Sequence, residues 1–281
     1  MFPQEASGLH CSGGCVSRTF RSPTSAKGGR LARECFRSCR GFTLLELLIV
    51  VGIIALLLVL IVPAFTNIKS AGDVTSAAYT IKGVLDTART YAKANNTYTW
   101  VGFYEENVSN PASPNSTTPP VGRVIISVVA SKDGTLLYTL PLTSLVTLTP
   151  ANLIQVGKLA KIDNVHLMTF PAPASTPPPD TFDTRPAVGS AAAQIGDTTP
   201  PSPSLSFQYP LGGSAQYTFV KVVQFSPRGE AVIDNSNYTL APVSEIGVEP
   251  TYGATVPASI PANVVAVQFT GVGGDVKIYR R

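Results

Sequence analysis

The carboxylate of Glu46 lies where a charge is costly, and its position is the first indication of chemistry in this sequence. Every other residue from Leu44 to Val62 is apolar or glycine. An ionised carboxylate within such a segment costs several kcal/mol in a membrane unless it pairs with a cation. Cleavage after Gly41 would supply that cation, because Phe42 would then carry a charged α-amino group near the first helical turn. The alternative is an unpaired acid that extends to the membrane boundary.

Residues 42–65, FTLLELLIVVGIIALLLVLIVPAF, predict one transmembrane helix. At about 1.5 Å per residue the segment is roughly 36 Å long, and a hydrocarbon core is about 30 Å thick. A cleavable secretory signal has a shorter apolar region that ends at a small-residue site, whereas this run continues into Val62-Pro63-Ala64-Phe65. Basic residues precede the segment, so we expect its N-terminal side in the cytoplasm and the rest of the chain across the membrane.

Residues 1–41 form a basic leader. They hold seven of the 21 Lys and Arg residues, two of the 17 Asp and Glu residues, and all four cysteines. The other residues carry a formal charge of −1, so they offer no basic surface to phosphates, and we expect no nucleic-acid partner. A zinc site is disfavoured and a disordered leader favoured, because Ser, Gly and Arg surround the cysteines, which are Cys11, Cys15, Cys35 and Cys39.

Residues 66–96 predict an amphipathic continuation of the helix. Apolar residues recur there at spacings of four and three, which is typical of one helical face. Pro63 lacks a backbone N–H, so we expect a kink there in a helix that runs from about Phe42 to about Asn95. The strands that follow can cover the apolar face, which comprises Val74, Ala78, Ile81, Leu85, Ala88 and Ala92.

Residues 97–281, here called the head, change to strand-like patterns. From Val121 the runs VGRVIISVVA and TLLYTL flank Lys132-Asp133-Gly134, which predicts a β-hairpin. Residues 171–204 are rich in Pro, Ala, Ser and Thr and poor in bulky apolar residues, so we expect an exposed loop. Residues 107–120 form a second polar insert. Further strands are predicted at 164–170, 205–209, 217–225, 230–234, 264–269 and 275–281.

The residues around the proposed cleavage point resemble those of a known family. The run Arg40-Gly41-Phe42-Thr43-Leu44-Leu45-Glu46, followed by LLIVVGIIALL, is similar to the type III signal of type IV prepilins and type II secretion pseudopilins. The resemblance implies cleavage between Gly41 and Phe42 by a prepilin peptidase, N-methylation of Phe42, and a role for Glu46 in assembly. It also implies packing with other pilin-like subunits in a filament built at an inner-membrane assembly platform. Pro63 lies where the family often has a helix-bending proline, while the leader is longer than usual.

Three later segments resemble the H-type minor pseudopilins and the related minor pilins of the fimbrial T type. Residues 85–96 contain an Ala-Arg pair before an Ala and an Asn near the helix end, although an ordinary Ala-rich helix is an alternative there. Residues 225–231, FSPRGEA, are similar to a Phe-x-Pro-x-Gly-x-Ala turn of that family, and residues 270–280 resemble its closing hairpin. The resemblance implies an α+β fold of the pilin-like lollipop type, with a long N-terminal helix packed on a C-terminal antiparallel β-rich head.

No group of residues in the sequence predicts catalysis. His166 is the one histidine after the leader and lies in an apolar strand pattern, where a packed histidine is commoner than a base. Glu105 and Glu106 are adjacent, so in a strand they would point apart and not form the opposed pair of a glycosidase. Asp180 and Asp183 lack the ligand density of a calcium site. We therefore expect no enzyme, no cofactor and no metal.

The sequence thus predicts a membrane-anchored filament subunit with four parts: a leader (1–41), a transmembrane half-helix (42–65), an amphipathic half-helix (66–96) and the head (97–281). We expect the leader in the cytoplasm, the apolar helix in the lipid of the inner membrane, and the head in the periplasm or outside the cell. A minor subunit is the first interpretation. The alternatives are a major pilin, and a membrane-anchored β-domain binding module or enzyme that does not polymerise.

Overall fold

The structure is a computed structural model. It describes residues 42–109, 111, 121–173, 181–197, 205–233, 235–237 and 239–281, without the side chains of residues 60–69. The chain divides into two compact units, residues 1–63 and residues 64–281. The predicted leader with Gly41 and the four cysteines lies outside the described residues, as do most of the 107–120 insert and parts of the 171–204 insert.

One α-helix, α1, runs from Leu44 to Ala94, within the range of the two predicted half-helices, 42–65 and 66–96. The helix assignment continues through Pro63, and the kink expected there stays a prediction. Asn96 follows the helix with a φ of 48°, and the Thr97 N–H donates to Ala92 O at 3.0 Å. This is the hydrogen bond of a Schellman ending, in which a residue in the left-handed region stops the helix.

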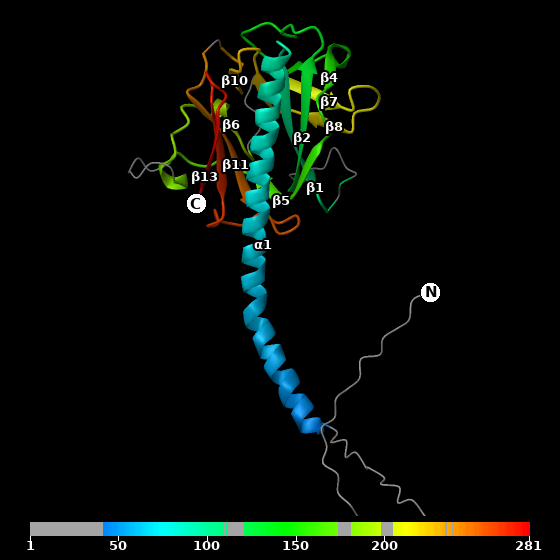
Figure 1. Ribbon diagram of the computed structural model, residues 1–281, viewed down its shortest axis with the longest axis vertical. Helices are drawn as coiled ribbons and strands as arrows, with labels where there is room; N and C mark the ends of the chain where they lie inside the picture. Colours follow the sequence, from blue (N-terminus) through cyan, green and yellow to red (C-terminus); the bar gives the residue numbers. More distant parts are fainter. Residues whose placement is uncertain are drawn as a thin grey trace, which may run out of the picture. The chain divides into compact units, whose positions relative to one another are not determined.

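Ten strands form one sheet that is mostly antiparallel, which confirms the predicted antiparallel head (Figure 1). The strand order is β10-β9-β1-β2-β5-β11-β12-β13, with β4 beside β2 and β6 beside β11. β6 pairs with β11 in parallel, and the other pairs of this sheet are antiparallel. The bounds are β1 Thr99–Asn107, β2 Gly122–Ser131, β4 Leu153–Gln155, β5 Ala160–Leu167, β6 Gln194–Ile195, β9 Lys221–Phe225, β10 Ala231–Val232, β11 Val243–Pro250, β12 Val265–Thr270 and β13 Val276–Arg280.

A smaller sheet of three strands has the order β3-β7-β8. Its strands are β3 Val146–Thr147, β7 Leu205–Tyr209 and β8 Tyr217–Phe219, and a 3-10 turn, η1 Pro150–Asn152, precedes β4. The predicted strand at 217–225 is therefore divided at Val220, since β8 ends before it and β9 begins after it.

Each face of the main sheet has its own hydrophobic core, because successive strand residues point to opposite faces. The six apolar residues predicted for the covered face of α1 are all buried in the main core, together with Phe103 of β1. Trp100 points the other way and packs with Phe207 and Phe219 of the smaller sheet. A Cβ at Gly102 would meet Phe219 at 2.5 Å, so the close approach of the two sheets requires glycine there.

β5 connects two halves of the main sheet. Its residues from Ala160 to Asp163 pair with β2, Val165 pairs with both β2 and β11, and the last two residues pair with β11. Asn164 lies between these pairings with a φ of 62°, and its amide donates to Asp73 Oδ2 of α1 at 3.0 Å. One half of the sheet therefore contains β10, β9, β1 and β2, and the other contains β11, β12 and β13.

The hairpin predicted around Lys132-Asp133-Gly134 is wrong, because residues 135–140 do not form a strand. β2 pairs with β1 on one side and with β4 and β5 on the other, so it has no free edge for a hairpin partner. Asp133 Oδ1 accepts hydrogen bonds from Thr135 and Ser131, which turn the chain away from β2. The same hydrogen bonds, those from Thr135 first, lower the pKa of Asp133 to about 2.

The prediction that residues 171–204 form an exposed loop is wrong for residues 181–197. That segment contains η2 (Phe182–Thr184), η3 (Ala191–Ala193) and β6. Phe182 and Ile195 are buried, and Arg185 forms a buried ion pair with Glu245. Although bulky apolar residues are few here, two of them and one paired cation are enough to hold the segment against the sheet.

No helix in the described part of the chain, which omits the side chains of residues 60–69, is both long and apolar enough to cross a membrane.

Candidate functional site

Thr43 and Glu46 form a capping box at the start of α1. Glu46 Oε2 accepts hydrogen bonds from the Thr43 N–H and the Thr43 hydroxyl, both at 3.0 Å. In return the Glu46 N–H donates to Thr43 Oγ1 at 3.2 Å. These bonds satisfy amides that the first helical turn leaves without partners. This role is not among the sequence predictions above, although Thr three residues before Glu at the start of an apolar run indicates it.

The cap uses one of the two carboxylate oxygens of Glu46. Both hydrogen bonds from Thr43 end on Oε2, and the Glu46 side chain is exposed in the single chain. Phe42, which directly precedes the capping threonine, is 83% exposed. Gly41, on the other side of the predicted cleavage point, lies outside the described residues. In the described part of the chain, the side-chain hydrogen bonds of Glu46 involve Oε2 alone, and the charge pair with a processed N-terminus stays a prediction.

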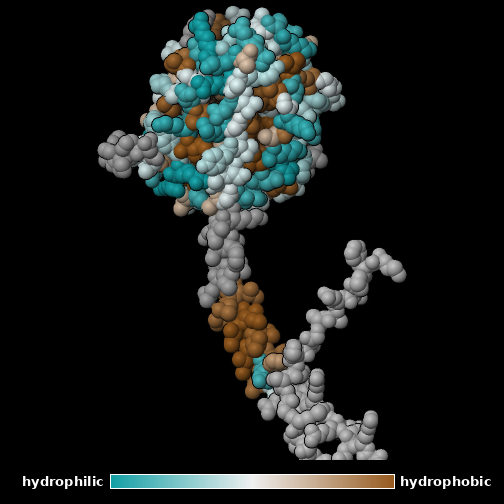
Figure 2. Space-filling model, viewed as in Figure 1, coloured by the Kyte–Doolittle hydropathy of each residue, from teal (hydrophilic) through white to brown (hydrophobic). Residues whose placement is uncertain are grey.

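The helix around Glu46 is apolar on all sides. From Phe42 to Val59 every Phe, Leu, Ile and Val side chain is between 48% and 83% exposed. Together these side chains form a continuous hydrophobic surface (Figure 2). Since a helix that is hydrophobic all round is stable only when protein or lipid covers it, this surface needs another molecule.

Arg89 of α1 joins the segments that resemble H-type subunits. Its Nη1 lies 2.9 Å from Asp275 Oδ1, in the turn between β12 and β13. Gly229, in the turn between β9 and β10, and Gly274 both lie against the Arg89 side chain. A Cβ at Gly274 would lie 3.2 Å from Arg89 Cδ, and one at Gly229 would lie 3.5 Å from Arg89 Nε. Three segments distant in the sequence thus meet at one place, residues 85–96, 225–231 and 270–280.

Gly274→Ala should lower the free energy of unfolding by about 1–3 kcal/mol, because Gly274 has a φ of 67° and its Cβ would meet Gly229 O at 2.5 Å. Asp275→Asn should lower it by less than about 1 kcal/mol, since Asp275 is 71% exposed and such pairs contribute little. Urea unfolding of the full chain in detergent, followed by circular dichroism, measures both. Equal effects of the two substitutions would contradict tight packing of the turn against Arg89.

A buried cluster of charged side chains joins β1, β5 and β9. Glu105 Oε1 lies 2.7 Å from His166 Nδ1 and accepts the Leu167 N–H at 2.8 Å. Glu105 Oε2 lies 3.2 Å from Lys221 Nζ, which also donates to Gly196 O. The three charged side chains are 13% exposed or less. Because Glu105 is occupied by partners from the protein itself, the cluster acts as a link between strands.

The pKa values of His166 and Glu249 are both shifted in this cluster. Burial alone would lower the pKa of His166, but the hydrogen bond to Glu105 and the charge of that carboxylate outweigh burial and raise the pKa. Glu249 lies opposite His166 in the pairing of β5 with β11, and burial raises its pKa. Glu249 Oε1 is buried and has no hydrogen-bond partner in the described chain. His166 itself is buried in the sheet, as expected of a packed histidine.

The other acidic candidates are separate from one another. Glu106 pairs with Arg123 at 2.8 Å, whereas its neighbour Glu105 pairs with His166 and Lys221. Asp183 lies on the surface, 3.7 Å from Arg281, and Asp180 lies outside the described residues. Among the residues that the structure describes, no three His, Cys, Asp or Glu side chains come together where they could hold a metal ion.

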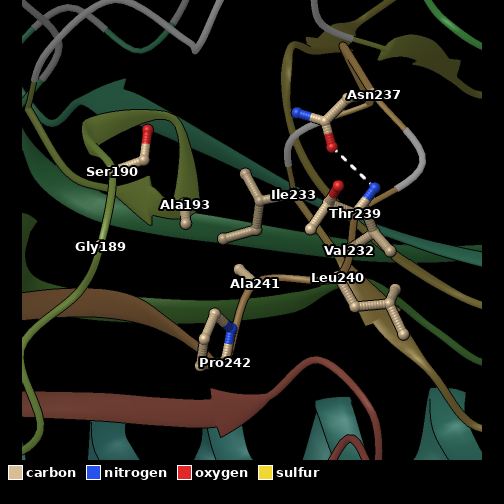
Figure 3. Close-up of a pocket in the computed structure, with 10 residues that line it drawn as sticks. All are labelled: Gly189, Ser190, Ala193, Val232, Ile233, Asn237, Thr239, Leu240, Ala241 and Pro242. Carbon is tan, nitrogen blue, oxygen red and sulfur yellow. Dashed lines mark hydrogen bonds between the residues drawn. The ribbon is translucent and has the colours of Figure 1, made fainter.

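A hollow of about 250 Å³ lies beside β10 (Figure 3). The residues that line it are small, hydroxyl-bearing, amide or aliphatic, and one hydrogen bond, from the Thr239 N–H to Asn237 Oδ1 at 2.8 Å, crosses its rim. Among the described residues the lining contains no acid, base or cation for catalysis, and it consists of Gly189, Ser190, Ala193, Val232, Ile233, Asn237, Thr239, Leu240, Ala241 and Pro242.

Comparison with known families gives one match, at the start of the helix. Residues 36–62 match the family model described as the prokaryotic N-terminal methylation motif. The match includes Gly41, Phe42 and Glu46 and supports a pilin-like subunit of a type IV pilus or a type II secretion system. The motif implies processing by a prepilin peptidase and assembly with other pilin subunits. No curated protein and no solved structure matches the chain.

Proposed function

We propose that the chain is a minor pilin-like subunit of the H or fimbrial T type, in a type II secretion or type IV pilus-like filament. The methylation motif at residues 36–62 carries this proposal. The exposed apolar surface of residues 42–59 supports it, because that surface contains a single acid next to the predicted processing point. A simple membrane anchor gains nothing from such an acid, whereas an assembling helix gains a charge pair.

The subclass is proposed from the contacts of Arg89. A chance resemblance at residues 85–96, 225–231 and 270–280 would not require these segments to meet. In the folded head Arg89 lies against Gly229 of the second segment. It also contacts Gly274 and Asp275 of the third segment. This agreement between sequence pattern and packing favours a shared structural motif.

Membrane anchoring and partners belong to the same proposal. Residues 42–65 anchor the chain in the lipid of the inner membrane, with the leader in the cytoplasm and the head in the periplasm or outside the cell. A prepilin peptidase removes the leader, and the inner-membrane assembly platform inserts the processed chain among other subunits. The protein is not an enzyme in this account. The described residues that line the hollow beside β10 include no ionisable group, and Glu105 binds both Lys221 and His166.

Quantitative mass spectrometry of sheared filaments tests the proposal. The chain should be present in filaments from cells that express it at its native level, in amounts well below those of the most abundant pilin-like subunit. An amount equal to that of the most abundant subunit would show a major pilin. Processed chain in the membrane with none in the filaments would show a tethered module that does not polymerise.

A further inference from the structure

We propose that residues 181–197, here called the clamp segment, form a pH-responsive element of the head. Its C-terminal end, at Gly196 and Asp197, is held against the sheet while His166 is protonated and loosens when His166 loses its proton. The proposal goes beyond the function proposed above and does not depend on it.

The N-terminal part of the clamp segment is held by an ion pair whose atoms are nearly inaccessible to solvent. Arg185 Nε lies 2.6 Å from Glu245 Oε2, and Arg185 Nη2 lies 3.2 Å from Glu245 Oε1. The Arg185 guanidinium also lies 4.3 Å from the centre of the Phe182 ring. Gln268 donates to Glu245 Oε2 at 2.7 Å. No histidine contributes to this anchor, so it should not respond to pH near neutrality.

The C-terminal end of the clamp segment is held differently. Lys221 donates to Gly196 O, and Asp197 Oδ1 accepts the Thr169 N–H at 3.1 Å. A Cβ on Gly196 would overlap Thr169 and the backbone of Met168, so the segment passes close to the end of β5. Lys221 in turn is paired with Glu105, which also binds His166. The position of Gly196 thus depends on a chain of contacts that ends on a titratable ring.

The charges around His166 show why its proton matters. Three carboxyl groups interact electrostatically with it, those of Glu105 (β1), Glu249 (β11) and Asp197 (clamp segment). The other cation is Lys221 of β9. With His166 protonated, two cations face three carboxyl groups. With His166 neutral, Lys221 alone faces them. Because unpaired carboxylates are costly in a buried site, opening of the clamp end to water then becomes cheaper.

The direction of the pH dependence follows from the pKa shifts. The pKa of His166 is raised, so its stabilisation is complete below the unfolded value of about 6.5 and is lost as pH rises through the folded pKa. The pKa of Glu249 is raised by burial, so its ionisation also destabilises the closed state as pH rises. Burial would raise the pKa of Asp197, but hydrogen bonds from Thr169 lower it, so its contribution is lost in acid, below about 4. The clamp should be most firmly closed between about pH 4 and 6.5.

Hydrogen exchange of the full processed chain in detergent micelles tests the proposal. After correction for the intrinsic rate, amides of residues 192–197 should exchange faster at pH 8.5 than at pH 5.5, by up to tenfold for each unit of the His166 pKa shift. Residues 265–270 of β12 should show no such change. His166 is the one histidine after Gly41, so the NMR titration of its ring is unambiguous, and its midpoint should coincide with the midpoint of the exchange change.

Two variants test whether protonation of His166, and not of another group, causes the pH dependence of exchange. His166→Asn keeps an N–H donor for Glu105 but cannot take up a proton, so exchange at residues 192–197 should lose its dependence on pH. Asp183→Asn is the matched control on the clamp segment, since Asp183 is exposed and pairs with Arg281, and it should behave as wild type. Equal protection of residues 192–197 at both pH values in the wild type would overturn the proposal, and this comparison needs no variant. An unchanged pH dependence in His166→Asn would overturn it as well.

Discussion

Glu46→Ala should leave cleavage of the leader intact and reduce incorporation into filaments by about a hundredfold. In the proposed assembly the Glu46 carboxylate neutralises the Phe42 amine of a neighbouring subunit inside an apolar filament core. Removing one partner of a buried pair costs about 3–5 kcal/mol, and the lower figure already corresponds to about two orders of magnitude in an association constant. Cleavage should be normal because the peptidase acts at the Gly41–Phe42 bond.

The capping box makes a sharper design possible, because the cap and the charge can be removed separately. Glu46→Gln keeps an oxygen that can accept the Thr43 hydrogen bonds but has no charge. Thr43→Ala removes the hydroxyl of the cap and keeps the charge, and loss of a cap costs about 0.5–2 kcal/mol. If the charge pair drives assembly, Glu46→Gln should fail like Glu46→Ala, Thr43→Ala should assemble better, and Glu46→Asp should be intermediate.

Mass spectrometry of the membrane fraction reports cleavage, and co-purification with sheared filaments reports incorporation. Glu46→Ala at the wild-type level in filaments would contradict the charge-pair role. If Glu46→Gln enters filaments normally and Thr43→Ala does not, the role of Glu46 is to cap the helix and not to form a charge pair.

Gly41→Leu should abolish processing, so that the full-length precursor accumulates in the membrane and no chain enters filaments. Glycine places no side chain beside the scissile bond, and a bulky residue should block access of the peptidase. Gly41→Ala is the matched control and should be processed at least in part. The ratio of precursor to processed chain on immunoblots measures the effect, and cleavage of Gly41→Leu before Phe42 at the wild-type rate would contradict it.

The sequence could predict the features that depend on local pattern. The spacing of Ile81, Leu85 and Ala88 predicts the buried face of α1, because one helical face must repeat every three or four residues. The cleavage motif around Gly41 and Glu46 could be predicted from the sequence, since it is a local run of residues that does not depend on the fold. The cap of Thr43 and Glu46 could have been predicted in the same way from its spacing.

Features that depend on distant partners could not be predicted. β1 was not predicted as a strand, and the two adjacent acids near its end, Glu105 and Glu106, are not typical of a buried strand. Their burial is possible only because Lys221 and Arg123 reach them from other strands. β11 was missed similarly, since Glu245 is matched by Arg185 from a segment whose composition indicated an exposed loop. In each case the partner of a buried charge lies at least 17 residues away in the sequence.

The N-terminus of the wild-type protein, extracted from the membranes of cells that contain the prepilin peptidase, is the most direct test of the account. Intact-mass and N-terminal peptide analysis should find a chain that begins at Phe42 and carries a methyl group on its α-amine. The same chain from cells without the peptidase should retain residues before Gly41. A mature chain that begins at any residue upstream of Gly41 when the peptidase is present would contradict the account.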